Sequence, residues 1–247
     1  MSVAGPAAPS GTRTEEAWAE DGRDWRADPR NDGPPDLLTG FRFPEGHVLG
    51  PLDAGKPISR QEFWELEFEG GWRYERGGGR LEVMPPPRRP HRRAAFVFRF
   101  HLSRYWMENQ ARVADVEGER WAHTDAGGDR QTDTTVVLKN SPLRGTAACF
   151  TDPERAPDVA IEFVSPGTDA RRRDYGAKRA EYHAIGVREY VIVDPRDRRV
   201  TVLRWEPGGY AEAAVLGPTD AYTSPLLPGL SIPLAEAIGD AAGADGE

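Results

Sequence analysis

Two carboxylates in the second half of the chain have surroundings that could hold a divalent cation. Asp133 opens a short segment with strand character, TDTTVVL, and Glu162 lies near the end of another, APDVAIEFV. If these strands pair antiparallel, the start of the first lies beside the end of the second, so the carboxylates converge at one end of the sheet. A divalent cation would relieve their repulsion. Because the ligands are hard oxygens without a histidine or cysteine pair nearby, they favour magnesium or manganese over zinc.

The helix expected after the second strand carries Asp174, Lys178 and Tyr182 at intervals of four residues, which places them on one stripe. Two interpretations stay open. Lys178 can form a surface pair with Asp174, with Tyr182 packing below. Alternatively the helix leans over the carboxylates, and Lys178 orients or deprotonates a water and offsets charge on a scissile phosphate. The second interpretation predicts that the lysine nitrogen lies within roughly 4–6 Å of an oxygen of Glu162 or Asp133.

Three other features of the sequence are interpreted as structural. Asp158 lies four residues before Glu162 on the same strand face, and four residues of strand span about 13 Å, too far to share one metal ion. We therefore expect Asp158 to bond a turn or neighbouring backbone. Cys149 has no paired histidine and is not expected to be a catalytic thiol. The glycines at 77–79 predict a hairpin turn, because no lysine and helix follow as in a phosphate-binding loop.

A basic segment precedes the longest expected helix. His91 follows PPPRRP, and a lone histidine at such a place more often makes a hydrogen bond at the helix start than a direct catalytic contact. The flanking arginines could hold phosphates at a helix N-terminus or form a solvated basic face, and both interpretations stay open. A second arginine cluster next to the carboxylates favours the first. The arginines of both clusters are Arg88, Arg89, Arg92, Arg93, Arg171, Arg172 and Arg173.

The first half of the chain predicts a helix, a hairpin and a long amphipathic helix. Regular structure is expected to start near Ile58, with Ser59 capping a short helix. Strands are expected over 71–75 and 79–84. The segment 91–111 predicts the long helix, because its apolar residues recur at intervals of three and four.

The second half predicts strands around one helix. Short strands are expected over 118–121 and 134–138, and a nearly continuous apolar strand over 156–164. A charged helix over 169–185 should end at Gly186. REYVIVD and RVTVLRW then predict two strands joined by a turn.

The strand–helix–strand passage from 157 to 194 predicts a parallel crossover, whereas the surrounding strands predict antiparallel hairpins. The expected fold class is therefore α/β, with an α+β-like mixed sheet flanked by helices. One domain is expected over 46–238. Residues 1–45 lack apolar periodicity and predict a disordered or loosely ordered extension, and 239–247 predict an acidic tail.

Charge and composition limit the classes of function. The formal net charge is −8, but residues 61–204 carry 25 bases against 23 acids, so local contact with phosphates is allowed although coating of nucleic acid is not. A single cysteine excludes a disulfide framework and a multi-cysteine zinc site. The chain lacks an apolar run of the ~18–20 residues that span a bilayer, and its start does not resemble a secretory signal. A soluble, cytoplasmic protein is expected.

The motifs and their order resemble the Uma-two family of endonucleases, within the PD-(D/E)XK nuclease superfamily. The resemblance covers about residues 58–235. It implies a restriction endonuclease-like core with flanking helices and antiparallel hairpins. The three segments that carry it are RYERGGGRLEVMPPPRRPH, TDTTVVL and APDVAIEFVSPGTDARRRDYGAKRAEYHAIGVREYVIVDP.

By this resemblance, Asp133 matches the metal-binding aspartate and Glu162 the acidic member of the (D/E)XK element. The lysine two residues later is absent, because that position is Val164; the family takes its lysine from the next helix, where Lys178 matches. Glu75 matches an early glutamate that supplements the metal site. Three more residues match supporting positions of the family: Tyr182, Asp174 and His91.

The resemblance implies a metal-dependent endonuclease that hydrolyses phosphodiester bonds, in DNA, by attack of a metal-activated water. The implied cofactor is Mg²⁺ or Mn²⁺, bound by Asp133, Glu162 and Glu75. DNA is the expected partner, no membrane partner is expected, and a homodimer is left open. The alternative is a catalytically silent nuclease-fold module that binds nucleic acid or a protein. The retained acids and lysine favour the enzyme, because a pure binder has no need of two repelling carboxylates beside a lysine.

Overall fold

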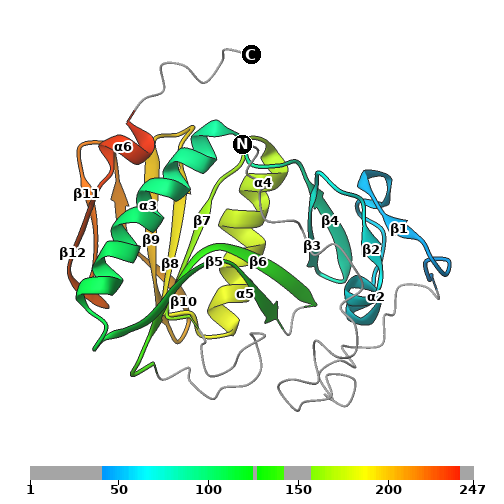
Figure 1. Ribbon diagram of the computed structural model, residues 1–247, viewed down its shortest axis with the longest axis horizontal. Helices are drawn as coiled ribbons and strands as arrows, with labels where there is room; N and C mark the ends of the chain where they lie inside the picture. Colours follow the sequence, from blue (N-terminus) through cyan, green and yellow to red (C-terminus); the bar gives the residue numbers. More distant parts are fainter. Residues whose placement is uncertain (1–40, 125–126, 142–156, 240–247) are drawn as a thin grey trace. The chain divides into compact units, whose positions relative to one another are not determined.

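The computed structural model describes three stretches of the chain: 41–124, 127–141 and 157–239 (Figure 1). These residues form two compact units. The first unit contains 41–86 and 127–130, and the second contains 87–124, 131–141 and 157–239. Most of the expected extension and of the acidic tail lies outside the described residues, as does Cys149. The expectations for them stay predictions.

The first unit contains the short helix that the sequence predicts. Helix α2 (Arg60–Glu65) begins after Ser59, whose hydroxyl accepts a hydrogen bond from the amide of Glu62. The carboxylate of Glu62 in turn accepts from the amide of Ser59. This capping box satisfies amides that the first turn of a helix leaves without partners, and it confirms Ser59 as the cap.

The predicted hairpin is also present. Strands β3 (Arg73–Gly77) and β4 (Arg80–Met84) pair antiparallel, with Glu75 opposite Glu82. Gly78 and Gly79 form the turn with φ angles of 56° and 72°. Glycine adopts this left-handed conformation without the steric penalty of a Cβ atom, which is why the three glycines predict the turn well.

Ordered structure begins earlier than Ile58, so the predicted start is wrong. Strand β1 (Val48–Leu49) pairs in parallel with β2 (Glu67–Phe68), and a 3₁₀ turn, η2 (Pro51–Asp53), follows it. The buried carboxylate of Asp53 accepts hydrogen bonds from the Gly50 amide at 2.9 Å and from Lys56 at 2.6 Å. Polar contacts therefore hold this segment, and they leave no apolar periodicity to detect.

The second unit is built on a mixed sheet, as the fold-class prediction requires. Strands β7 and β8 are parallel, whereas the pairs β10–β9, β9–β8 and β7–β6 are antiparallel. Strand β6 begins in the first unit, where its Asp129 pairs with Arg76, and it continues into the second. The strands in spatial order are β10 (Gly209–Leu216), β9 (Arg199–Glu206), β8 (Glu189–Asp194), β7 (Val159–Phe163) and β6 (Gly128–Leu138), and β5 (Val113–Thr124) pairs with β6.

Helices cover both faces of this sheet (Figure 1). All residues of β7 are buried, and alternate residues enter different cores. Ile161 and Phe163 pack in one cluster with Phe98 of α3 (Arg89–Glu108), and Ala160 packs in the other with Tyr182. The crossover between β7 and β8 consists of α4 (Thr168–Arg172), a π-helical turn η4 (Arg173–Ala177) and α5 (Lys178–Ala184). This confirms the predicted parallel crossover and its C-terminal Gly186, which has a φ of 83°.

Strands β5 and β6 are much longer than the short strands predicted at 118–121 and 134–138. Their polar side chains interrupt the alternation that identifies a strand, and Glu119 has a positive φ of 58° that marks an irregularity in β5. The charged residues nevertheless stay in the strand because they have partners there. Arg120, for example, pairs with Glu117.

The chain after β10 forms elements that the sequence patterns did not predict. They complete the cluster around α3 with buried residues such as Tyr222 and Ile232. None of the described helices is both long enough and apolar enough to cross a membrane. The three elements are β11 (Ala221–Ser224), β12 (Leu227–Pro233) and α6 (Ala235–Ile238).

Candidate active site

The register of β6 and β7 brings two carboxylates to the same end of the paired strands. Thr134 lies opposite Ile161 in this antiparallel pair. Asp133 precedes Thr134 and Glu162 follows Ile161, so the two acids continue the pairing on opposite strands. Both side chains are buried, Asp133 at 8% exposure and Glu162 at 2%. The register therefore places the two residues at the same end of the paired strands, as the sequence predicts, and a shared metal site stays a prediction.

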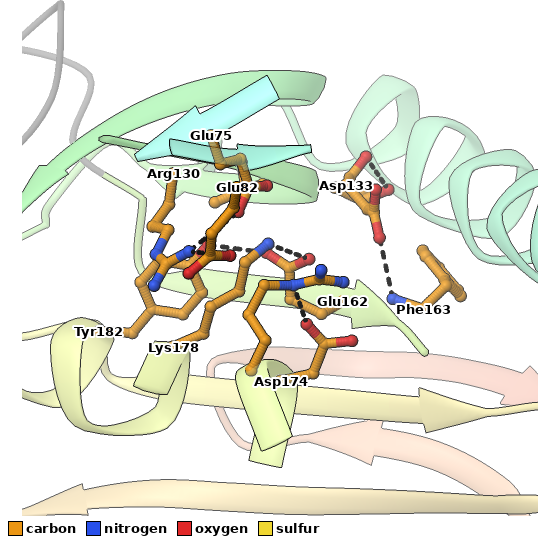
Figure 2. A network of polar contacts seen from close by, with 12 residues as sticks. Glu75, Glu82, Arg130, Asp133, Glu162, Phe163, Asp174, Lys178 and Tyr182 are labelled. Carbon is orange, nitrogen blue, oxygen red and sulfur yellow. Dashed lines mark hydrogen bonds and ion pairs between the residues drawn. The ribbon is translucent and has the colours of Figure 1, made fainter. Parts of the chain in front are cut away.

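Both oxygens of the Glu162 carboxylate are held from the crossover helices (Figure 2). The Nζ atom of Lys178 lies 2.9 Å from Oε2, and the hydroxyl of Tyr182 donates to Oε1 at 2.7 Å. Lys178 is itself 2% exposed. Burying the lysine ammonium costs free energy unless an opposite charge compensates it, and the Glu162 carboxylate provides that charge. The distance expected if the helix leans over the carboxylates is confirmed, because 2.9 Å lies within the expected limit of roughly 4–6 Å.

A π-helical turn immediately before Lys178 sets the direction of this side chain. The amide of Lys178 donates to the carbonyl oxygen of Arg173, five residues earlier. Such turns insert one residue into a helix and often occur at functional sites. In the same turn the carboxylate of Asp174 accepts from Nε of Arg173 at 3.0 Å. Lys178 and Asp174 are both buried, so the interpretation of Lys178 as part of a surface pair is wrong.

The negative groups of this region also act on Tyr190 of β8. Its hydroxyl donates to the carbonyl oxygen of Asp174 at 2.8 Å. Burial raises the pKa of Tyr190 well above its usual value, and the charges of Glu162 and Asp174 raise it further. Tyr190 therefore stays neutral, and its hydrogen bond to Asp174 connects β8 to the π-helical turn. Its ring packs edge-on against the ring of Tyr182.

The carboxylate of Asp133 is oriented by a backbone amide and a histidine. Its Oδ2 atom accepts from the amide of Phe163 at 3.0 Å (Figure 2). The same atom lies 3.1 Å from Nε2 of His91. His91 belongs to the first turn of α3, is 6% exposed and packs edge-on against the Phe163 ring. Because a carboxylate only accepts hydrogen bonds, Nε2 carries the proton in this contact. His91 is thus placed to position Asp133.

Glu75 lies in the first unit and is bound there by Arg130. The Nη1 atom of Arg130 is 3.3 Å from Glu75 and 2.8 Å from Glu82, the residue opposite Glu75 in the hairpin. Glu75 and Arg130 are almost fully buried. The expectation that Glu75 supplements a metal site stays a prediction. Sequence analysis missed Arg130 and Glu82, although the glycine turn alone implies that Glu75 and Glu82 are paired.

A family model described as a putative restriction endonuclease, Uma2, matches residues 60–235. The chain belongs to the Uma2 family. Among solved structures, it is similar to a putative nuclease of the DUF820 group from Anabaena variabilis, with 16% sequence identity and a TM-score of 0.51. That match covers 67% of this chain and 89% of the other. No curated protein matches the chain. The resemblance inferred from the motifs, and the restriction endonuclease-like fold, are confirmed.

The two arginine clusters differ in the structure. Arg88, Arg89, Arg92 and Arg93 are exposed around the start of α3. In the second cluster, Arg171 pairs with Asp194 and Asp197, and Arg173 pairs with Asp174. Arg172 is the most exposed of that trio, at 81%. Direct contact with nucleic acid stays a prediction for all seven, and the geometry supports it best for the four at α3 and for Arg172.

The carboxylates of the second unit fit a magnesium site in their chemistry. Among the described residues, no group of three or more histidine, cysteine, aspartate or glutamate side chains is gathered closely enough to hold a metal ion. Mg²⁺ does not require such a cage, because it keeps several waters and is commonly bound through one or two carboxylates. Asp133 and Glu162 each supply a carboxylate, the hard oxygen ligand that Mg²⁺ prefers.

Asp158 has the structural role that was expected of it. It is fully buried and accepts hydrogen bonds from the backbone amide of Leu138 at 2.8 Å and the hydroxyl of Ser141 at 2.9 Å. Arg188 pairs with it at 3.2 Å. Asp158 therefore links the end of β6, the start of β7 and the approach to β8, away from the carboxylate site.

This contact gives a prediction for the pH dependence of stability. Burial raises the pKa of Asp158 above 3.8, and its hydrogen-bond donors oppose that rise. When the pKa of a carboxyl is higher in the folded than in the unfolded state, the folded state binds the proton more tightly. The free energy of unfolding therefore falls as the pH rises from the unfolded-state pKa to the folded-state pKa. Asp158→Asn should flatten this fall. Urea unfolding of both proteins from the ordinary aspartate pKa of about 3.9 up to neutral pH measures it, and parallel profiles would contradict the expectation.

Proposed function

We propose that this chain is a metal-dependent endonuclease that hydrolyses phosphodiester bonds in DNA. The observation that carries the proposal is the buried contact of Lys178 and Tyr182 with Glu162, at the strand end that also holds Asp133. Membership of a family described as putative restriction endonucleases supports nuclease activity in general. The metal, the DNA substrate and the residue roles are this proposal.

Asp133 and Glu162 would hold one or two Mg²⁺ or Mn²⁺ ions, with Glu75 as a further ligand by the family resemblance. Such an ion lowers the pKa of a bound water and polarises the phosphate. The residues around the two carboxylates fix them for this role. The Phe163 amide and His91 orient Asp133, and Tyr182 orients Glu162. Partners of this kind usually keep metal ligands in position.

Lys178 would act on the reacting groups rather than on the fold alone. Its ammonium group contacts Glu162 near the C-terminal end of β7, where a scissile phosphate would bind. There it can orient the attacking water and offset the charge that develops on the phosphate. A buried lysine–carboxylate pair occurs both in catalytic sites and in structural ion pairs. The catalytically silent alternative is therefore decided by activity.

The test is cleavage of supercoiled plasmid by the full-length chain. We expect nicking with Mg²⁺ or Mn²⁺ and none with chelator, because two carboxylates without a cation would repel the phosphate. A second readout does not need turnover: Mn²⁺ bound to the protein alone should be detected by electron paramagnetic resonance. Cleavage that persists in chelator would contradict the metal requirement. Mn²⁺ binding without any cleavage would favour a silent binding module.

A further inference from the structure

Helix α3 exposes two large aromatic side chains on the face turned away from the core. Phe96 is 67% exposed and Phe100 is 55% exposed, whereas Phe98 on the inner face is fully buried. The rings of Phe96 and Phe100 lie 6.3 Å apart with planes 26° from parallel. Phe96 and Phe100 are one helical turn apart, so they form one continuous apolar surface. Contiguous exposed apolar surface is a feature of binding sites, so we ask what these two rings could contact.

Arginines surround this pair, and acids are absent from the whole segment. Between Pro85 and Met107 the sequence contains six arginines and no aspartate or glutamate. The first turn of α3 likewise contains no acid. The arginines nearest the two rings are all exposed. We define the aromatic–arginine face of α3 as Arg92, Arg93, Phe96, Arg99 and Phe100.

This face lies next to the carboxylate site. His91, in the turn that carries Arg92, contacts Asp133 at 3.1 Å. Arg99, seven residues after Arg92 on the same helix, approaches the backbone of Asp133. A Cβ atom placed on Gly118 of β5 would lie 2.9 Å from Nη1 of Arg99 and 3.4 Å from the carbonyl oxygen of Asp133. The Arg99 guanidinium and the backbone carbonyl of Asp133 therefore approach the same point of the β5 backbone.

The charges identify the occupant. A second copy of the chain packed by the same face would bring the arginines of two helices together, which is repulsive. Nucleic acid offers the opposite charge together with flat rings. Aromatic side chains stack on bases only where the bases are unpaired, and a basic groove that follows the backbone is the usual companion of such stacking.

We propose that the aromatic–arginine face of α3 binds a single-stranded stretch of nucleic acid beside the Asp133 carboxylate. Phe96 and Phe100 stack on successive unpaired bases, while Arg92, Arg93 and Arg99 contact the phosphates. The proposal rests on the proposed nuclease function and narrows its substrate. The site would act where a strand leaves a duplex, such as a single-stranded end, flap or gap, rather than on continuous duplex.

The experiment measures binding separately from cleavage. A fluorescein-labelled single strand of about 20 nucleotides and the blunt duplex of the same sequence are titrated with full-length protein in chelator, and anisotropy is recorded. The double variant Phe96→Ala with Phe100→Ala should raise the Kd for the single strand about tenfold or more. The Kd for the duplex should change less than about threefold. Arg92→Gln with Arg99→Gln should reduce the salt dependence of single-strand binding, by about 0.7 in the log–log slope for each lost contact.

Leu52→Ala is the matched control, because Leu52 is 93% exposed in the first unit and should leave both affinities unchanged. Both rings are exposed, so the thermal midpoint of the double variant should match wild type. An unchanged single-strand Kd, or an equal loss on single strand and duplex, overturns the inference. A drop in sedimentation mass with unchanged nucleic-acid affinity also overturns it and assigns the face to a second copy.

The outcomes separate this inference from the proposed function. Glu162→Gln should keep the affinity for the single strand while it removes cleavage. If the wild-type chain binds single strands through Phe96 and Phe100 but cuts no nucleic acid, the proposed function fails and the binding face stands. If it cuts continuous duplex, and the double variant at Phe96 and Phe100 has the wild-type Kd for the single strand, the proposed nuclease function stands and the binding face fails.

Discussion

Glu162→Gln should reduce plasmid cleavage in Mg²⁺ at least about 100-fold, the scale for losing one group that stabilises charge in the transition state. The substitution keeps the size of the side chain, and its carbonyl oxygen still accepts from Tyr182, which now donates at 2.7 Å. It removes the negative charge that would hold the metal ion and that compensates buried Lys178. The rate of nicking at saturating Mg²⁺ measures the effect.

The chain provides a closely matched control for this substitution. Glu189 of β8 is another fully buried glutamate held by one tyrosine and one base, Tyr222 at 2.6 Å and Arg204 at 3.2 Å. Glu189→Gln therefore makes the same chemical change in a similar environment that is not part of the proposed site. It should leave cleavage unchanged. If Glu162→Gln cuts as fast as wild type while keeping its fold, the site is wrongly assigned.

The site in the second unit was largely predictable because strand register and helix periodicity are local properties. The predicted strand starts with Asp133 and its neighbour nearly ends with Glu162, so antiparallel pairing places those residues side by side, and this holds although β6 itself begins earlier, at Gly128. The position of Lys178 depends on a helix that returns over the same sheet, which the uninterrupted apolar strands also imply. The π-helical turn before Lys178 was not predicted, since no sequence signal distinguishes it from an ordinary helix.

Residues that are held by polar partners far along the chain were harder to predict. Arg130 is 1% exposed, and its partner Glu75 is 55 residues away. A sequence pattern gives no indication that such a charge is buried, because burial depends on a partner that only the fold supplies. The length of β5 was underestimated for a different reason. Its charged residues interrupt the alternation of a strand, although they are close in sequence and pair within it, as Arg120 does with Glu117.

The contrast extends to α3. Its buried face was predicted from apolar spacing, and Phe98 and Leu102 are indeed in the core. The exposed phenylalanines fall between these positions and were not recognised as a separate surface. Apolar residues on the outer face of a helix are informative only once the inner face is known, because a sequence alone does not show which side is covered.

Lys178→Met should lower the cleavage rate about 100-fold or more, since the methionine keeps most of the stem and removes the charge beside Glu162. Arg179→Met is the matched control. It likewise replaces a positively charged side chain with methionine, one residue later, where the guanidinium donates to the carbonyl oxygen of Tyr210 instead. That variant should cut at the wild-type rate. The thermal midpoint of both variants, measured alongside, shows whether a slow rate reflects lost folding.

Metal binding then distinguishes the two roles of the lysine. If Lys178 acts on the reacting phosphate and water, Lys178→Met should bind Mn²⁺ as well as wild type or better, because one cation no longer repels another. Slow cleavage with intact Mn²⁺ binding would therefore place the lysine in the chemistry. Slow cleavage with lost Mn²⁺ binding would mean that Lys178 only holds Glu162 in position. An unchanged rate would leave the carboxylates as the proposed site and remove the lysine from it.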